Sequence, residues 1–120
     1  MGRQILLTVE GEAPLRDGDW HEVCAVTAEV LKRKKCVEVT LRHGKGEHEG
    51  RCHVVQLALP IRPHGITAEF FRACGFEVSE GTTVRPSEVV GRTLEVKFQI
   101  DLTGMAVVSS FRGYAQETPN

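Results

Sequence analysis

Apolar and polar side chains alternate with a period of two along most of the chain, which predicts β-strands that have one buried face. The pattern is clearest where Leu94, Val96, Phe98 and Ile100 are separated by polar side chains. The segments that show it are residues 3–10, 20–31, 36–43, 51–59, 93–100 and 105–114. We therefore expect a mainly β protein.

The same alternation predicts which side chains face the core. In the third and fourth of these segments the inward positions are Val37, Val39, Leu41, Val55, Leu57 and Leu59. In residues 20–31, unbroken alternation places Cys24, Val26, Ala28 and Val30 on one face and Val23, Ala25, Thr27 and Glu29 on the other.

The period changes after Pro60 and Pro63, and residues 68–74 are predicted to form a short helix. Thr67 is suited to cap its start, and Gly75 is suited to the left-handed conformation at its end. A second short turn is expected over residues 85–91, with Ser87 as its cap.

The order of these elements predicts the fold. Without residues 1–12, which form an extra N-terminal strand, the order is three strands, a helix and two strands. This is the order of the OB-fold, a five-stranded, partly open Greek-key barrel. A β-sandwich with the helix as a crossover is the alternative. The 120 residues fit a single domain that spans residues 1–120 and ends in a flexible tail, residues 115–120.

Composition and charge limit the kinds of partner. The net charge is −1, so binding to nucleic acid would need a local basic patch. No apolar run approaches the roughly 18 residues of a membrane span, and no signal peptide is recognisable. The cysteines never form a C-x-x-C pair, which favours buried free thiols over a zinc or redox site. We expect a cytoplasmic protein.

Four consecutive basic side chains, Lys32, Arg33, Lys34 and Lys35, lie between two predicted strands. In an OB-fold, nucleic acids lie across strands 2 and 3 and contact the loops that join strands 1 to 2 and 4 to 5. The basic turn would be the first of these loops. The alternative is a solvated hairpin turn, flanked by Glu29 and Glu38, that only keeps the protein in solution.

A second group of residues flanks the glycine-containing loop of residues 44–50. His43, His48, Cys52 and His53 could in principle hold a transition metal across a hairpin. Their spacing matches no ligand template, and the glycines are explained as turn residues. We therefore expect no metal and no cofactor.

Three stretches resemble a known group of proteins over residues 15–114. These are LRDGDW at 15–20, FFRACGF at 70–76 and SEVVGRTLEVKF at 87–98. In these stretches the chain is similar to the small OB-fold proteins of phages and prophages that act as single-stranded DNA-binding or recombination-accessory proteins. The resemblance implies binding of single-stranded DNA with little sequence preference, in phage-type replication or recombination, without cofactor or catalysis. The residues do not distinguish DNA from RNA.

Such binding needs cations that contact phosphates and aromatic rings that stack on bases. The candidate residues are Lys32, Arg33, Lys34, Lys35, Arg42, Lys45, Arg51, Lys97, Arg112, Trp20 and Tyr114. The outward positions of strands 2 and 3 contain no aromatic ring; they are Glu38, Thr40, Arg42, Val54, Gln56 and Ala58. The chain also lacks the acidic, phenylalanine-ended tail by which bacterial single-stranded-DNA-binding proteins recruit partners.

Two other functions were weighed. One is an assembly module that forms a homo-oligomer through an edge strand, in particular the predicted N-terminal strand. The other, an enzyme, is not expected. The sequence GKG at 44–46 lacks the remaining residues of a phosphate-binding P-loop, and no G-x-S-x-G motif occurs. Glu47, His48 and Glu49 lie on a glycine loop that would position them poorly for catalysis.

Overall fold

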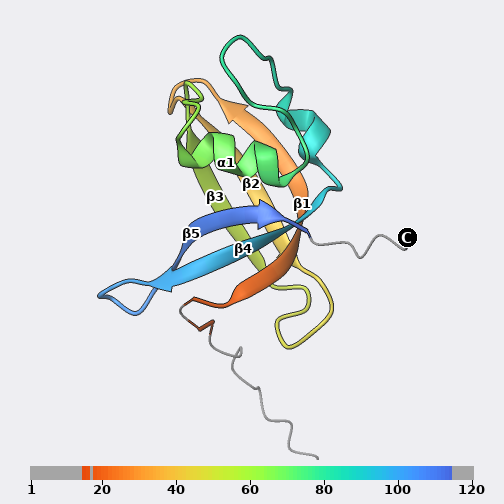
Figure 1. Cartoon of the computed structure of the whole chain (residues 1–120). Coiled ribbons are helices and arrows are strands. Elements are labelled where there is room, and N and C mark those ends of the chain that lie inside the picture. Colours follow the sequence, from red (N-terminus) through yellow and green to blue (C-terminus); the bar gives the residue numbers. More distant parts are fainter. Residues whose placement is uncertain (1–14, 17, 115–120) are drawn as a thin grey trace, which may run out of the picture.

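The computed structural model describes residues 15–16 and 18–114 (Figure 1). The strands are β1 (Trp20–Leu31), β2 (Cys36–His43), β3 (Cys52–Ala58), β4 (Thr93–Ile100) and β5 (Ala106–Gly113). Helix α1 (Ile66–Ala73) and the 3-10 helix η1 (Pro86–Val89) lie between β3 and β4. The predicted order of three strands, a helix and two strands is confirmed. The predicted strand at residues 3–10 and the tail at 115–120 lie outside the described residues.

The five strands form one antiparallel sheet in the order β3-β2-β1-β4-β5. β1 is central and pairs with both β2 and β4. No hydrogen-bonded ladder joins the edge strands β3 and β5 within the described part of the chain, so the sheet is open. Helix α1 contacts both edge strands, and β5 more extensively. The protein is thus mainly β, an open five-stranded sheet with one α-helix.

A β-bulge in β1 changes which of its side chains face inward. Ala25 pairs with Leu41 and Thr27 with Thr40, so Val26 is an extra residue without a partner in β2. An extra residue reverses the alternation of faces and bends the strand. Val23 and Ala25 are buried before the bulge, and Ala28 packs against the core after it. The predicted unbroken faces of residues 20–31 are therefore wrong.

The inward positions predicted in β2, β3 and β4 are confirmed, and Ile100 at the end of β4 is partly buried. The buried side chains at predicted inward positions are Val37, Val39, Leu41, Leu57, Leu94, Val96 and Phe98, and the partly buried ones are Val55 and Leu59. The core is completed by α1, whose Phe70 and Phe71 are fully buried. The Phe70 ring lies edge-on to Phe71 and to Phe111 of β5, at centroid distances of 5.4 and 5.2 Å.

The ends of α1 differ in part from the sequence prediction. Its first residue is Ile66 and the capping position is Gly65, so Thr67 lies inside the helix rather than before it. The Thr67 hydroxyl instead donates to the carbonyl oxygen of Ala58 (2.8 Å) and connects the helix to the end of β3. Gly75 follows the helix with φ of +99°, as predicted.

One further contact joins α1 to β5, and the start of η1 differs from the prediction. The Phe111 N–H of β5 donates to the Glu69 carboxylate of α1 (3.0 Å). Ser87 lies inside η1 and does not cap it, because the capping position is Arg85 and no side chain bonds there.

Among the described residues, no helix is long and apolar enough to cross a membrane.

All four cysteines are free thiols. Cys36 and Cys74 are buried, and burial raises the pKa of Cys74 to about 12. Cys24 is partly buried and Cys52 is exposed, because both lie on the outward face of the sheet, where they pair in register with Arg42. The expectation of buried thiols is thus met by only two of them.

Candidate nucleic-acid interface

The four basic side chains of residues 32–35 lie at the tip of the β1–β2 hairpin and are all exposed. The Lys35 N–H donates to the Lys32 carbonyl (3.3 Å), and the Lys35 carbonyl accepts from the Leu59 N–H just after β3 (2.8 Å). Within the part of the chain that the structure describes, none of the four side chains forms an ion pair. Their charge is therefore presented to solvent.

Other predicted cations lie far from this basic turn. Lys45 and Arg51 belong to the β2–β3 loop, at the opposite end of β2 (Figure 1). β2 has eight residues, which at a rise of about 3.3 Å per residue amounts to about 25 Å. Arg42 is exposed on the outward face of β2. These cations therefore do not form one patch around the basic turn.

Three predicted residues from three different strands do meet, and we call them the Trp20 cluster: Trp20 of β1, Lys97 of β4 and Arg112 of β5. Trp20 and Lys97 are opposite each other in the β1–β4 pair. The Arg112 guanidinium carbon lies 4.1 Å from the Trp20 ring centroid and the Lys97 ammonium 5.6 Å from it. Cations over an indole ring are attracted by its negative face.

The Trp20 cluster is partly accessible. The Trp20 residue is partly buried, and the Arg112 side chain is 50% exposed while it pairs with Glu95 of β4 (3.2 Å). A hollow of about 340 Å³ lies beside Lys97 and is lined by Gly18, Gln99 and Ser110 among others. The cluster therefore offers an aromatic ring, two cations and polar neighbours on the outward face of the sheet.

Tyr114, the other predicted aromatic candidate, and two phenylalanines do not join this cluster. Phe111 is buried in the core, and Phe76 is partly buried beneath the Arg92 guanidinium (5.1 Å). Tyr114 is 41% exposed and lines a different cavity, together with Arg72 and Arg92. Trp20 is therefore the aromatic residue with two predicted cations beside it.

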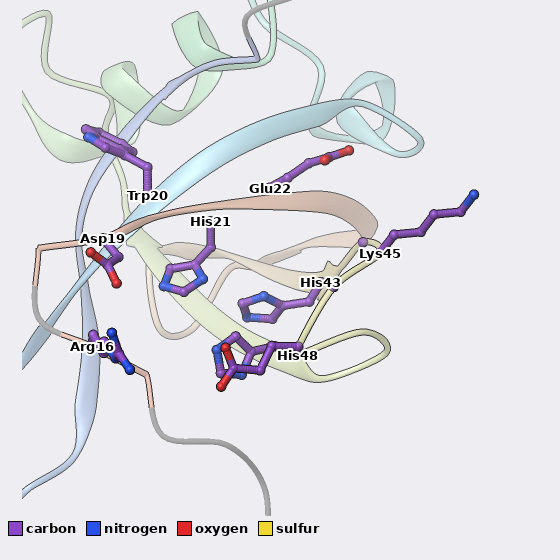
Figure 2. A pocket seen from close by; sticks show the side chains of 11 residues that line it. Arg16, Asp19, Trp20, His21, Glu22, His43, Lys45 and His48 are labelled. Carbon is purple, nitrogen blue, oxygen red and sulfur yellow. The ribbon is translucent and has the colours of Figure 1, made fainter.

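Four histidines form a cluster, and Figure 2 shows three of them, His21, His43 and His48, on the other side of β1 from Trp20. The ring centroids of this cluster are 5.4 Å apart for His21–His43, 5.4 Å for His21–His48, 5.3 Å for His43–His48 and 4.9 Å for His43–His53. The Nε2 atoms of His43 and His53 are 2.9 Å apart. His43, His48 and His53 were expected to lie together, whereas the expected Cys52 is exposed on the outward face.

His21 was missed in the sequence. It lies more than twenty positions before the other three histidines, and only the pairing of β1 with β2 brings it beside His43. Its inward position, next to the outward Trp20, was a usable signal that we did not apply.

Burial and the neighbouring rings favour the neutral forms of His43 and His21. Burial, followed by the neighbouring His53, His21, His48 and Arg51, lowers the pKa of His43 to about 4. Burial and His48 lower the pKa of His21, and Asp19 and Glu47 oppose this effect. The rings of His21, His43 and His53 pack against Phe98 of β4, whose centroid is 4.7 Å from that of His53. Protonation would therefore place unfavourable charge in a packed region.

A cavity of about 340 Å³ opens onto this cluster (Figure 2). It is lined by Arg16, Asp19, Trp20, His21, Glu22, His43, Gly44, Lys45, Gly46, Glu47 and His48. The cavity lining thus contains three carboxylates and two basic side chains, so the cavity is not selective for anions.

No protein-family model matches the chain, and a search of curated proteins finds no sequence similar to it.

Proposed function

We propose that this protein binds single-stranded nucleic acid, in the manner of an OB-fold protein, and that the Trp20 cluster is the centre of the interface. The order of elements supports an OB-fold-like arrangement: a meander β1-β2-β3, a helix, then β4 paired with β1. The OB-fold is itself a partly open barrel. Helix α1 contacts β3 and β5, the two edge strands that would have to pair to close the sheet into a barrel.

The contact between Trp20, Arg112 and Lys97 carries this proposal. Proteins that bind single strands without sequence preference stack bases on aromatic rings and contact phosphates with nearby cations. An arginine plane over an indole extends the flat surface on which a base can stack. Lys97, from the neighbouring strand, is placed to contact the phosphate that follows. The ligand we propose is single-stranded DNA, in replication or recombination.

The two loops that flank the ligand in OB-folds would extend this interface. The β1–β2 turn, with the four solvent-facing cations of residues 32–35, lies at the opposite end of β1 from the Trp20 cluster and would contact a more distant part of the same nucleic-acid strand. The β4–β5 turn exposes Leu102 and Met105, which are apolar and can contact bases or sugars. Asp101 holds this turn by accepting hydrogen bonds from the Thr103 hydroxyl and the Met105 N–H at 2.6 and 3.0 Å.

Binding of labelled oligo(dT), followed by fluorescence anisotropy between about 50 and 200 mM salt, tests this proposal. We expect affinity to fall steeply with salt. We also expect the slope of log K against log salt to decrease by about 0.7 for each lost phosphate contact. Lys97→Gln/Arg112→Gln should lower both affinity and slope, and so should the fourfold glutamine variant of residues 32–35.

Arg62→Gln/Arg85→Gln is the matched control, because both arginines are exposed and lie outside the proposed interface. It should bind as the wild type does. Oligo(U) in place of oligo(dT) distinguishes RNA from DNA. Absence of binding by the wild type would refute the proposal. If Lys97→Gln/Arg112→Gln lowers affinity no more than the control does, the Trp20 cluster is not part of the interface. If the fourfold glutamine variant of residues 32–35 lowers affinity no more than the control does, the basic turn is not part of it.

A further inference from the structure

The histidine rings lie on the other side of β1 from the Trp20 side chain, although Trp20 also lines the cavity that reaches them (Figure 2). The histidine cluster brings together four of the chain's five histidines, from β1, β2, the β2–β3 loop and β3. Imidazole nitrogens are the protein ligands that Zn²⁺ and related divalent transition metals most often use besides thiolates. We propose that His21, His43 and His48 bind one divalent transition metal ion of the zinc type.

The spacing of the three rings agrees with this proposal. Their mutual centroid distances are 5.4, 5.4 and 5.3 Å, which is nearly an equilateral triangle. In a tetrahedral site with Zn–N bonds of about 2.0–2.1 Å, the centroids of two bound imidazoles are about 5 Å apart. The rings therefore already have the separation that a shared ion requires.

Two ring nitrogens at this place have no hydrogen-bond partner. His21 Nε2 and His48 Nδ1 are both buried, and neither bonds to any other atom of the described residues. Buried polar atoms normally have a partner, and one without a partner requires an explanation. A metal ion between the rings would satisfy both nitrogens.

His53 is assigned a positioning role. Its Nε2 atom lies 2.9 Å from Nε2 of His43, so the two rings share a hydrogen bond. Metal-binding histidines usually form such a bond through the nitrogen that does not bind the ion, which fixes the ring and its tautomer. The Nδ1 atom of His43 is then its candidate donor to the ion.

A cavity gives a cation access to the rings, and its lining has more carboxylates than basic side chains. The cavity of about 340 Å³ that reaches the rings is lined by the carboxylates of Asp19, Glu22 and Glu47 and by two basic side chains, Arg16 and Lys45. A water molecule or the Glu47 carboxylate would supply the fourth ligand.

The donors are not fully preformed. Among residues 15–16 and 18–114, no three His, Cys, Asp or Glu side chains are already arranged to hold a metal ion. Binding therefore requires the rings to turn. His48 lies in a loop where Gly46 and Gly50 adopt positive φ angles of +136° and +82°, so this loop is able to adjust.

The proposal is tested with Co²⁺ as a spectroscopic probe, on untagged full-length protein that carries Cys52→Ser to remove the exposed thiol. We expect one Co²⁺ per chain, with the intense visible absorption of a tetrahedral site, and displacement of Co²⁺ by Zn²⁺. His48→Ala, in the loop, and His21→Asn should each weaken binding by at least tenfold. His53→Ala should weaken it about 10- to 100-fold.

His64→Ala is the matched control, because His64 is exposed in the segment before α1. It should bind as the parent does. Circular dichroism of each variant checks that the fold is retained. Failure to bind Co²⁺ or Zn²⁺, or binding by His48→Ala and His21→Asn equal to that of the parent, would overturn the proposal. Neither result would bear on nucleic-acid binding.

Discussion

Replacing Phe98 with alanine is expected to lower the free energy of unfolding by about 3–5 kcal/mol. Phe98 is 1% exposed and lies on the inward face of β4. Its ring packs against those of His21, His43 and His53, at centroid distances of 5.4, 6.0 and 4.7 Å. Alanine would leave a cavity at this position and would remove the support for the histidine cluster.

Urea unfolding followed by circular dichroism measures this loss. Phe98→Leu should cost less, because a branched apolar side chain fills part of the space. Val107→Ala, on the neighbouring strand, should change stability by less than about 0.5 kcal/mol, because Val107 is 50% exposed. A loss of under about 1 kcal/mol for Phe98→Ala would contradict the packing described for this end of the core.

Stability is expected to fall by about 3 kcal/mol as the pH decreases from 6.5 to 4. The pKa of His43 is lowered from 6.5 to about 4 in the folded state, with burial as the largest cause. Between these two values the unfolded chain binds a proton at His43 that the folded chain does not. Acid therefore favours unfolding in this range, and His43 adds no further slope above or below it.

Chemical unfolding at several pH values, with a chelator present, tests this dependence. His43→Asn should have a smaller slope of unfolding free energy against pH between 4 and 6.5, whatever its absolute stability. His64→Asn is the control, because His64 is exposed, and its slope should equal that of the wild type. Equal slopes for His43→Asn and the wild type would show that His43 is not held neutral by its surroundings.

The strands could be predicted from the sequence because one face of each is buried. Leu94, Val96 and Phe98 alternate without interruption, and each is buried as expected. The bulge at Val26 could not be predicted, since no local pattern marks it and the pairing with β2 determines it. Closure of the sheet depends on contacts between β3 and β5, which are far apart in the sequence.

The candidate interface was predictable residue by residue, but its arrangement was not. Trp20, Lys97 and Arg112 were each proposed separately, and the register of three strands brings them together. The separation of the basic turn from Lys45 and Arg51 was predictable, because successive loops of an antiparallel meander lie at opposite ends of the strands. The histidine cluster was only partly predicted because His21 comes from a different strand.

The affinity of single-stranded oligo(dT) for the wild type and for Trp20→Ala tests the central claim most directly. We expect the wild type to bind and the alanine variant to lose about 1–3 kcal/mol of binding free energy, while Trp20→Phe, which keeps an aromatic face, loses less. Thermal unfolding confirms that the variants are folded. Equal affinity of folded Trp20→Ala and the wild type would contradict the claim that a base stacks at the Trp20 cluster.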